Sequence, residues 1–323
     1  MKIGFHASHE QFAPSALLAL AVEAQDAGFD AIKSSDHFHP WSERQAQSGF
    51  AWSWLGAAMA RTTVPFGTIT APGYRYHPAI TAQAIATLGE MFGGDRLWVA
   101  LGSGQAINEA IIGQVWPDKP ERNARLAECA AVIRRLLAGE TVTHRGRITV
   151  VEAKIYSRPA ETPRLFGAAV SKGSAALVAR WADGLLTTGG EIEGVREVVE
   201  AFREAGGAGK PVIIQDALSW ARTEDEAYDQ AISQWAPTAI GGDVNWDLRR
   251  PADFDLLAKA IGREEIDSCV AVSSDLGRQA SRIAAYRELG VDSVYLHNVG
   301  TNQREFVQAF GRHVLPQLGG GRQ

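Results

Sequence analysis

Short apolar runs and segments with helical spacing alternate along the chain. The run 2–7 is typical of a strand, and after it apolar residues recur at helical spacing between Leu17 and Ala24. Pro14 stands where the first turn of this helix is expected, and Gly28 stands where such a helix ends. The alternation continues along the chain with short connections. This order predicts a parallel sheet whose strands are joined by right-handed helical crossovers.

The pattern contains eight predicted strands. They are 2–7, 30–34, 64–70, 96–101, 164–169, 184–188, 211–217 and 293–297. Helices are expected at 54–61, 78–91 and 120–137, among others. A doubly wound sheet usually needs fewer strands, so the count favours a closed (β/α)₈ barrel, the TIM barrel.

Two stretches do not fit the simple alternation. Residues 139–162 resemble a hairpin, and 236–268, which include Pro237 and Pro251, predict an inserted loop with a short helix. Long insertions of this kind are commonly functional lids. Because no linker or low-complexity run separates the elements, we expect a single barrel domain over 1–323 with these two insertions.

Composition excludes several classes of protein. The chain is 46% hydrophobic and 21% charged, and its net charge of −5 provides no basic field for nucleic acid. Two cysteines, Cys129 and Cys269, are too few for a disulfide framework or a thiolate metal cage. Neither a signal-like apolar segment nor an 18-residue apolar run is present, so no membrane partner and a cytoplasmic location are expected.

Polar and aromatic residues follow the predicted strands at their carboxyl ends, where the active site of a barrel lies. The densest signal is 36–41, in which His37 is suited to acid–base catalysis and Trp41 can flank a planar molecule. Glu10 follows the first strand, and His297 closes the last. His37 could instead merely cap its strand, and for His39 a structural role is the stronger interpretation.

The His37-Phe38-His39 sequence also suggests a metal site like that of amidohydrolase barrels. That architecture requires two further histidines, a bridging lysine or carboxylate, and an aspartate on the final strand. The last strand offers His297 and no aspartate. A metal-dependent hydrolase is therefore the weaker alternative, and no metal ligand is assigned.

Two loops have the composition of cofactor-binding segments. Gly102, Ser103 and Gly104 follow the fourth strand, and glycines allow the backbone to approach a flat ring closely. The later segment 171–174 begins a helix, and its amides together with Lys172 form a candidate phosphate site or an ordinary helix cap. The charged helix 120–137, which contains Arg122, is expected to show a solvated face.

Four motifs together resemble the luciferase-like flavin-dependent oxidoreductases, and within them the clade of F420-dependent glucose-6-phosphate dehydrogenase. The motifs are 7–14 (ASHEQFAP), 35–41 (SDHFHPW), 74–79 (YRYHPA) and 102–109 (GSGQAINE). The likeness covers nearly the whole chain. It implies a (β/α)₈ barrel with insertions, a homodimer, and F420 or FMN bound at the carboxyl mouth.

The resemblance also implies roles for individual residues. Asp36 would lie against the cofactor ring, His37 would be the catalytic histidine, and Trp41 would steady the reacting intermediate. Glu10 would be a nearby carboxylate, and a non-prolyl cis peptide at Ile69–Thr70 would lie behind the ring. The further residues expected to line this pocket or bind the cofactor are Gly102, Ser103, Gly104, Gln105, Asn108, Glu109, Ser171, Lys172, Gly173 and Ser174.

Departures from the clade concern its substrate. Gln105 stands where the sugar-phosphate enzyme has a proton-donating glutamate, and an amide cannot titrate. The places of its phosphate clamp of two lysines and an arginine fall at Gly190, near Leu256, and at Cys269. Glucose 6-phosphate is therefore not expected as the substrate, because a charge-assisted clamp is missing.

The sequence thus predicts a flavin- or F420-dependent oxidoreductase that transfers hydride between the cofactor ring and a small organic substrate. An FMNH₂-dependent monooxygenase is the alternative within the same family, since it needs reduced FMN in a dry, oxygen-accessible pocket. A flavin-binding protein without turnover is a weaker third possibility, because His37 and Trp41 are both present.

Overall fold

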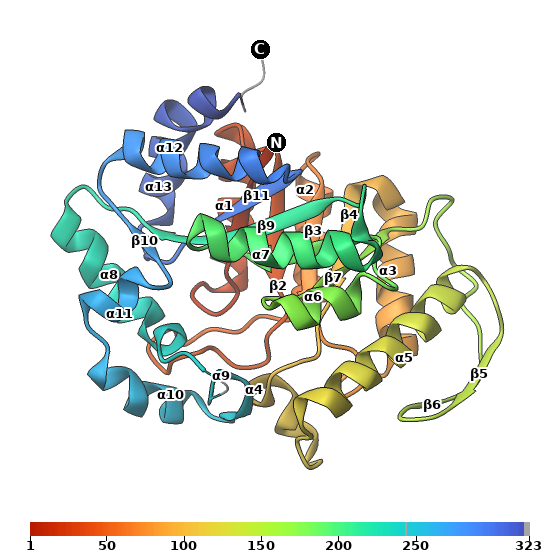
Figure 1. The fold of residues 1–323 in the computed structure, drawn as a ribbon. Helices are drawn as coiled ribbons and strands as arrows, with labels where there is room; N and C mark the ends of the chain where they lie inside the picture. Colours follow the sequence, from red (N-terminus) through yellow and green to blue (C-terminus); the bar gives the residue numbers. More distant parts are fainter. Residues whose placement is uncertain (243, 320–323) are drawn as a thin grey trace.

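The computed structural model describes residues 1–242 and 244–319. Its centre is a closed barrel of parallel strands with helices around it (Figure 1). The barrel strands are β1 (Lys2–Ala7), β2 (Ala31–Ser35), β3 (Phe66–Thr70), β4 (Leu97–Leu101), β7 (Arg164–Ala168), β8 (Gly184–Thr188), β9 (Val212–Ser219) and β11 (Ser293–Asn298). They follow the order β9-β11-β1-β2-β3-β4-β7-β8, and β8 pairs again with β9, which closes the barrel. The predicted (β/α)₈ fold and all eight predicted strands are confirmed.

The helices pack on the outward faces of these strands. They are α1 (Pro14–Asp26), α2 (Ala51–Arg61), α3 (Pro78–Phe92), α5 (Lys119–Leu137), α6 (Lys172–Val178), α7 (Ile192–Phe202), α8 (Glu224–Ala239), α12 (Leu276–Ala285) and α13 (Gln303–His313). The first helix begins at Pro14 as predicted and ends just before Gly28, whose φ of 97° is readily adopted by glycine. The main apolar core lies between these helices and the outward side chains of the strands.

Large aromatic side chains fill the part of the barrel interior that is farther from the carboxyl ends of the strands. Trp98 donates a hydrogen bond from Nε1 to the Tyr295 hydroxyl at 3.1 Å, and Phe166 packs against the Trp98 ring. Two glycines make room for these rings, each on the strand next to the one that carries the ring: Gly4 on β1 beside β11, and Gly67 on β3 beside β4. A Cβ on Gly4 would stand 2.3 Å from the Tyr295 ring, and one on Gly67 would stand 2.0 Å from the Trp98 ring.

The Gly67→Ala variant is therefore expected to be destabilised, because the added methyl group overlaps a buried indole that cannot move aside. Overpacking of this kind costs about 1–3 kcal/mol or more, which urea denaturation measures directly. Gly194→Ala is the matched control, since a Cβ there meets nothing within 4 Å on an exposed turn of α7. It should be neutral or stabilising by up to about 1 kcal/mol. Equal stability of Gly67→Ala and the parent protein would contradict the packing described.

Two segments of the chain lie outside the alternation of barrel strands and helices. The first is an antiparallel hairpin of β5 (Val142–Arg145) and β6 (Thr149–Ala153), which projects from the barrel at the right of Figure 1. In the second, α8 continues through Pro237, and three short helices follow. These are α9 (Val244–Asp247), α10 (Pro251–Leu257) and α11 (Arg263–Asp267). The prediction of a single short helix there was wrong.

Two short elements were not predicted. Helix α4 (Ala106–Glu109) follows β4 directly, and strand β10 (Ala271–Val272) extends the pairing at the end of β9. Within the described part of the chain, no helix is long and apolar enough to cross a membrane.

Candidate active site

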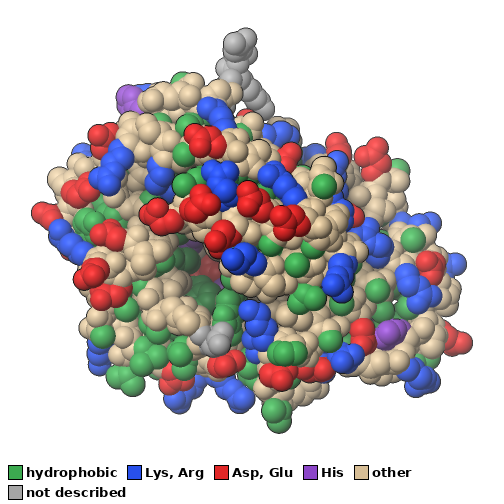
Figure 2. Space-filling view, viewed as in Figure 1, with side chains coloured by type: hydrophobic (Ala, Val, Ile, Leu, Met, Phe, Trp, Pro, Cys, Tyr) green, Lys and Arg blue, Asp and Glu red, His purple; other side chains and the backbone are tan. Residues whose placement is uncertain are grey.

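A deep cavity of about 1330 Å³ opens at the carboxyl ends of the strands. Figure 2 shows the surface hollowed between α7 and the segment α8–α11. The cavity lining includes every predicted site residue except Lys172. These lining residues are Glu10, Asp36, His37, Trp41, Ile69, Thr70, Gly102, Ser103, Gly104, Gln105, Asn108, Glu109, Ser171, Gly173 and Ser174.

His37 and Glu10 form the pair that the cavity wall offers for acid–base chemistry. The His37 Nδ1 atom lies 3.2 Å from Glu10 Oε1, and the His37 side chain is 13% exposed. The other Glu10 oxygen accepts a hydrogen bond from the Ser8 hydroxyl at 2.8 Å. The Ser48 hydroxyl donates to the His37 carbonyl at 2.9 Å, which ties down the loop after β2.

Burial and the neighbouring charges have opposite effects on the pKa of His37, and likewise on the pKa of Glu10. Burial lowers the pKa of His37, against the opposing pull of the Glu10 carboxylate. Burial alone would raise the pKa of Glu10, but His37, the backbone and Ser8 together bring that pKa below its ordinary value. The pair is thus poised as a neutral imidazole that can take up a proton beside an ionised carboxylate that can stabilise the resulting cation.

Trp41 lies against His37 with ring centroids 5.4 Å apart. Its other side packs edge-to-face on Phe254 of α10 at 5.3 Å. Trp235 of α8 belongs to the same small apolar cluster and also lines the cavity. The insertion therefore holds Trp41 in place and covers this end of the cavity with aromatic surface.

Asp36 is the centre of a buried polar network. It accepts hydrogen bonds from Thr70 Oγ1 at 2.8 Å and from the Tyr76 hydroxyl at 3.2 Å. The Arg75 guanidinium lies 3.3 Å from Asp36 Oδ2 and 3.2 Å from Glu109 Oε1. Burial raises the pKa of Glu109 to about 7, although Arg75 opposes this shift. Arg75 therefore forms ion pairs with two buried carboxylates in the cavity wall.

Helix α4 fixes the loop after β2. Asn108 Oδ1 accepts from the backbone N–H groups of Phe38 at 2.9 Å and His39 at 3.3 Å, and its amide nitrogen donates to Gln105 Oε1 at 3.4 Å. The His39 ring bonds through Nδ1 to the Ile107 carbonyl at 2.7 Å. His39 thus has the structural role that the sequence favoured.

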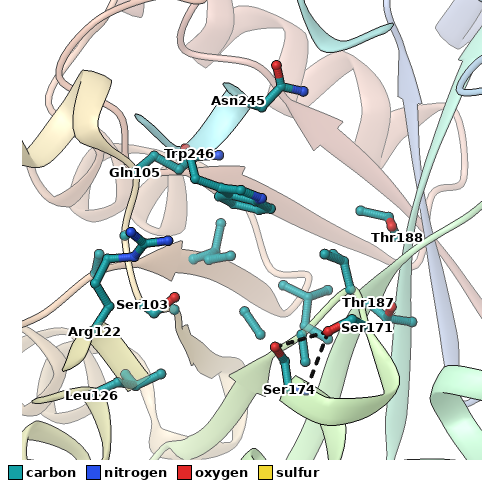
Figure 3. A pocket seen from close by; sticks show the side chains of 18 of the residues that line it. Ser103, Gln105, Arg122, Leu126, Ser171, Ser174, Thr187, Thr188, Asn245 and Trp246 are labelled. Carbon is teal, nitrogen blue, oxygen red and sulfur yellow. Dashed lines mark hydrogen bonds between the residues drawn. The ribbon is translucent and has the colours of Figure 1, made fainter. Parts of the chain in front are cut away.

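The loop after β7 lies on the opposite side of the cavity. Figure 3 shows Ser171 and Ser174 at the start of α6, below the indole of Trp246, which extends from α9 into the cavity. Ser171 caps α6 through a hydrogen bond accepted from Ser174 N at 3.4 Å. Lys172 does not join them: its ammonium group pairs with Glu197 at 3.2 Å on the surface. The structure therefore gives no support to the predicted phosphate contact of Lys172.

The expected cis peptide at Ile69–Thr70 is not found, since every described peptide bond is trans. The trans form is lower in energy by about 3 kcal/mol for a non-prolyl bond. In this arrangement the Thr70 carbonyl accepts a hydrogen bond from Gly102 N at 2.9 Å, which continues the pairing of β3 with β4.

Arg122 was wrongly expected on a solvated helix face. It is 5% exposed, lines the cavity, and donates from Nη1 to the Pro117 carbonyl at 2.8 Å, with its guanidinium over the Trp116 ring. Sequence reasoning also missed Gln215, Trp235 and Trp246 as cavity residues. An arginine between other charged residues gives no sign of burial, whereas Gln215 could have been found as a polar residue inside a predicted strand.

The arrangement gives the metal alternative no ligand set. No group of three or more His, Cys, Asp or Glu side chains able to hold a metal occurs among the residues that the structure describes. The His39 ring is engaged by the Ile107 carbonyl, and His297 lies in the barrel 3.2 Å from Gln11 Oε1.

A parallel barrel with an acid–base pair at its carboxyl mouth defines a TIM-barrel enzyme. Residues 1–293 match the family described as luciferase-like monooxygenase. The chain belongs to this family.

Among its relatives is the F420-dependent glucose-6-phosphate dehydrogenase of Microbacterium testaceum, which is 35% identical across 98% of this chain and 97% of that protein. The enzyme of the same description from Nakamurella multipartita is 34% identical across 98% and 96%.

Two solved structures share the whole fold. One is an F420-dependent secondary alcohol dehydrogenase in complex with an F420-acetone adduct, with a TM-score of 0.90, 30% identity, and 98% of both chains covered. The other, the F420-dependent tetrahydromethanopterin reductase of Methanopyrus kandleri, has a TM-score of 0.78 and 19% identity, with 98% of both chains covered.

Proposed function

We propose that this chain is an oxidoreductase that transfers hydride between F420 or FMN and a small, uncharged secondary alcohol or its ketone. One observation carries the substrate class: at the cavity end next to His37, the lining residues from α8 and the insertion are uncharged, and Trp41, Trp235 and Trp246 give this end aromatic surface. The similarity to a secondary alcohol dehydrogenase that holds an acetone adduct supports the same class.

The residues at this end explain why a sugar phosphate is a poor substrate. The lining residues that α8 and the insertion contribute here are Trp235, Thr238, Asn245, Trp246, Ser268 and Cys269. At the three places of the sugar-phosphate clamp, Gly190 and Cys269 are uncharged and Leu256 is 63% exposed. The nearby Lys259 is exposed and is not part of the cavity lining. A phosphate placed here would lose its water without gaining a charge-assisted partner.

The residues present fit a flat cofactor ring. Gly102 lies in the cavity wall, and a Cβ there would make ordinary contacts with Ala168 at 3.7 Å and Ile69 at 3.9 Å, so packing does not require glycine and its absence of a side chain leaves this space to a ligand. Ile69, Thr70 and Ser103 continue this wall, and Asp36 presents its carboxylate beside it. Ser171, Gly173 and Ser174 offer backbone and hydroxyl groups to a phosphate at the far end.

F420 or FMN, when bound, would supply the hydride acceptor for the carbon that carries the hydroxyl group. The chain's own residues handle the proton. Neutral His37 takes the hydroxyl proton, and the Glu10 carboxylate stabilises the imidazolium that forms. Trp41 and Trp246 exclude water and press the substrate against the ring position. Gln105 can donate a hydrogen bond there but no proton.

The first test is a cofactor titration followed by a substrate assay. Purified protein is titrated with F420 and FMN in both redox states, followed by fluorescence, and is then supplied with propan-2-ol or glucose 6-phosphate. We expect binding at micromolar concentration and oxidation of propan-2-ol without oxidation of glucose 6-phosphate. Turnover of glucose 6-phosphate at an equal rate would overturn the substrate class, and binding of neither cofactor would overturn the function.

The same titration tests the alternative within the family. A marked preference for reduced FMN, followed by oxygen uptake with substrate, would point to an FMNH₂-dependent monooxygenase instead. The monooxygenases among the structural neighbours are at most 20% identical and share only the fold. The homodimer and the cytoplasmic location are further proposals that rest on the family resemblance and the composition, and sedimentation equilibrium tests the dimer.

A further inference from the structure

The layer of the barrel interior next to the cavity is polar. The layer farther from the carboxyl mouth is the aromatic one that contains Trp98, Phe166 and Tyr295. Four side chains form this polar layer: His6 of β1, Lys33 of β2, Gln215 of β9 and His297 of β11. Their strands are neighbours in the order β9-β11-β1-β2. His6, Lys33 and His297 are at most 2% exposed. Burying such groups is costly, and the hydride step described above uses none of them.

Lys33 fixes the orientation of Gln215. Its Nζ donates to Gln215 Oε1 at 2.5 Å, and also to the Ser34 carbonyl at 3.3 Å and Ser35 Oγ at 3.4 Å. An ammonium group is a donor only, so its partner atom in the amide must be the oxygen. The Gln215 NH₂ group is therefore turned away from Lys33. Gln215 lines the cavity, and its nitrogen donates to no other group in the described part of the chain.

We propose that Lys33 is a positioning residue of the cofactor site: it turns the N–H groups of Gln215 toward the cavity, so that the barrel floor binds a carbonyl edge of the cofactor ring and favours the reduced ring. This inference rests on the proposed function. Flavin and deazaflavin rings both carry carbonyl oxygens that accept hydrogen bonds, and both become richer in electrons on reduction. A fixed donor backed by a buried cation stabilises that added charge.

Among the titratable groups that face Lys33, one carboxylate opposes the effect of burial on its charge. Glu10 and His6 face it from β1 and the loop that follows, His37 from the end of β2, and His297 from β11. Burial lowers the pKa values of all three histidines, so Glu10 is the anion of this set. Burial also lowers the pKa of Lys33 to about 7, with Glu10 acting in the opposite direction. The cation is therefore present below about pH 7 and is lost above it.

Two substitutions separate the roles of the two residues. Lys33→Met keeps the length of the side chain and removes the charge. Gln215→Glu keeps the size and the contact with Lys33, but replaces the N–H donor that faces the cavity with an oxygen. The dissociation constants of oxidised and reduced FMN and F420 are measured for each variant under anaerobic conditions, together with the midpoint potential of the bound cofactor.

Lys33→Met is expected to weaken binding of the reduced form about tenfold more than binding of the oxidised form, which corresponds to a potential about 30 mV lower for a two-electron couple. Gln215→Glu is expected to weaken both forms by about tenfold or more, because an acceptor then faces a carbonyl. The preference of the parent protein for the reduced form should shrink as the pH rises through 7, and that of Lys33→Met should not. An unchanged ratio of the two dissociation constants in Lys33→Met would overturn the inference.

Lys210→Met is the matched control, since Lys210 precedes β9 at the opposite end of the barrel and bonds to the Ala179 carbonyl. Its dissociation constants should equal those of the parent protein. Lys33→Met removes a costly buried charge but also leaves Gln215 Oε1 without its donor, so urea denaturation checks its folding before binding is measured. If it does not fold, unchanged cofactor affinity in Gln215→Glu alone would refute the proposal. If the parent protein binds neither cofactor, it is the proposed function that fails.

Discussion

Replacing His37 by Asn should lower the turnover of alcohol oxidation by a factor of about 10² to 10⁴, the range expected when a general base is lost. An asparagine amide has a similar size but cannot take up the hydroxyl proton. The Ser48 contact is with the His37 carbonyl, so the loop position does not depend on the imidazole. Steady-state assays with propan-2-ol, combined with the cofactor titration, should show lost turnover at roughly unchanged cofactor affinity.

The pH profile distinguishes lost chemistry from lost structure. His37 must be neutral to accept a proton, and burial lowers its pKa below the ordinary value of 6.5. Alcohol oxidation by the parent protein should therefore be level above about pH 6.5 and decline on the acid side as His37 becomes protonated. The residual activity of His37→Asn should lack this decline. His144→Asn, which changes a histidine paired with Glu128 beside the hairpin, should behave like the parent protein. Full turnover by His37→Asn would remove the acid–base assignment.

The architecture of this chain was predictable because local signals agree with the global fold. Runs such as 97–101 are apolar throughout, as expected for strands covered on both faces. Pro14 and Gly28 mark the ends of α1. In the same way, α3 begins at Pro78 and ends just before Gly93. Eight such strands with intervening helices leave a closed barrel as the simplest arrangement. The positions of the site residues then follow, because carboxyl ends of parallel strands meet at one mouth.

The residues that sequence reasoning misplaced depend on contacts between distant segments. Arg122 has the sequence surroundings of a solvated arginine, but in the folded chain the Trp116 ring covers its guanidinium and Asp247 of α9 pairs with it at 3.6 Å. Lys172 stands at a helix start beside the cavity, but its long side chain reaches Glu197 instead. Neither outcome can be read from spacing, because each is decided by which partner the folded chain brings within reach.

The insertion shows a different limit of prediction. Pro237 suggested the end of a helix, yet α8 continues to Ala239 around it. The Thr238 hydroxyl donates to the Trp235 carbonyl at 2.8 Å near this proline, which satisfies a local acceptor. Phe254 then packs on Trp41 across a sequence separation of more than two hundred residues. The positions of the residues at the mouth were therefore predictable from strand ends, whereas the shape of the substrate end required the structure.

Replacing Arg75 by Met should destabilise the fold by about 3–5 kcal/mol at neutral pH, the usual result of removing one partner from a buried ionic group. Arg75 is the cation placed between Asp36 and Glu109, whose side chains are at most 1% exposed. Methionine preserves much of the length of the side chain, so the change removes charge more than volume. Urea denaturation at pH 8 and at pH 5.5 measures the effect.

The pKa of Glu109 determines how the stability of Arg75→Met should change with pH. Burial already raises the pKa of Glu109 to about 7 in the presence of Arg75, and losing the guanidinium should raise that pKa further. A raised folded-state pKa contributes stability that is complete below about pH 4.5 and is lost as the pH rises through the folded value. The variant should therefore recover part of its stability at pH 5.5 relative to pH 8. Arg134→Met, which breaks a surface pair with Asp183, should cost at most about 1 kcal/mol at either pH. An equal loss at both pH values in Arg75→Met would mean that Arg75 acts through its packing on the Tyr76 ring rather than through its charge.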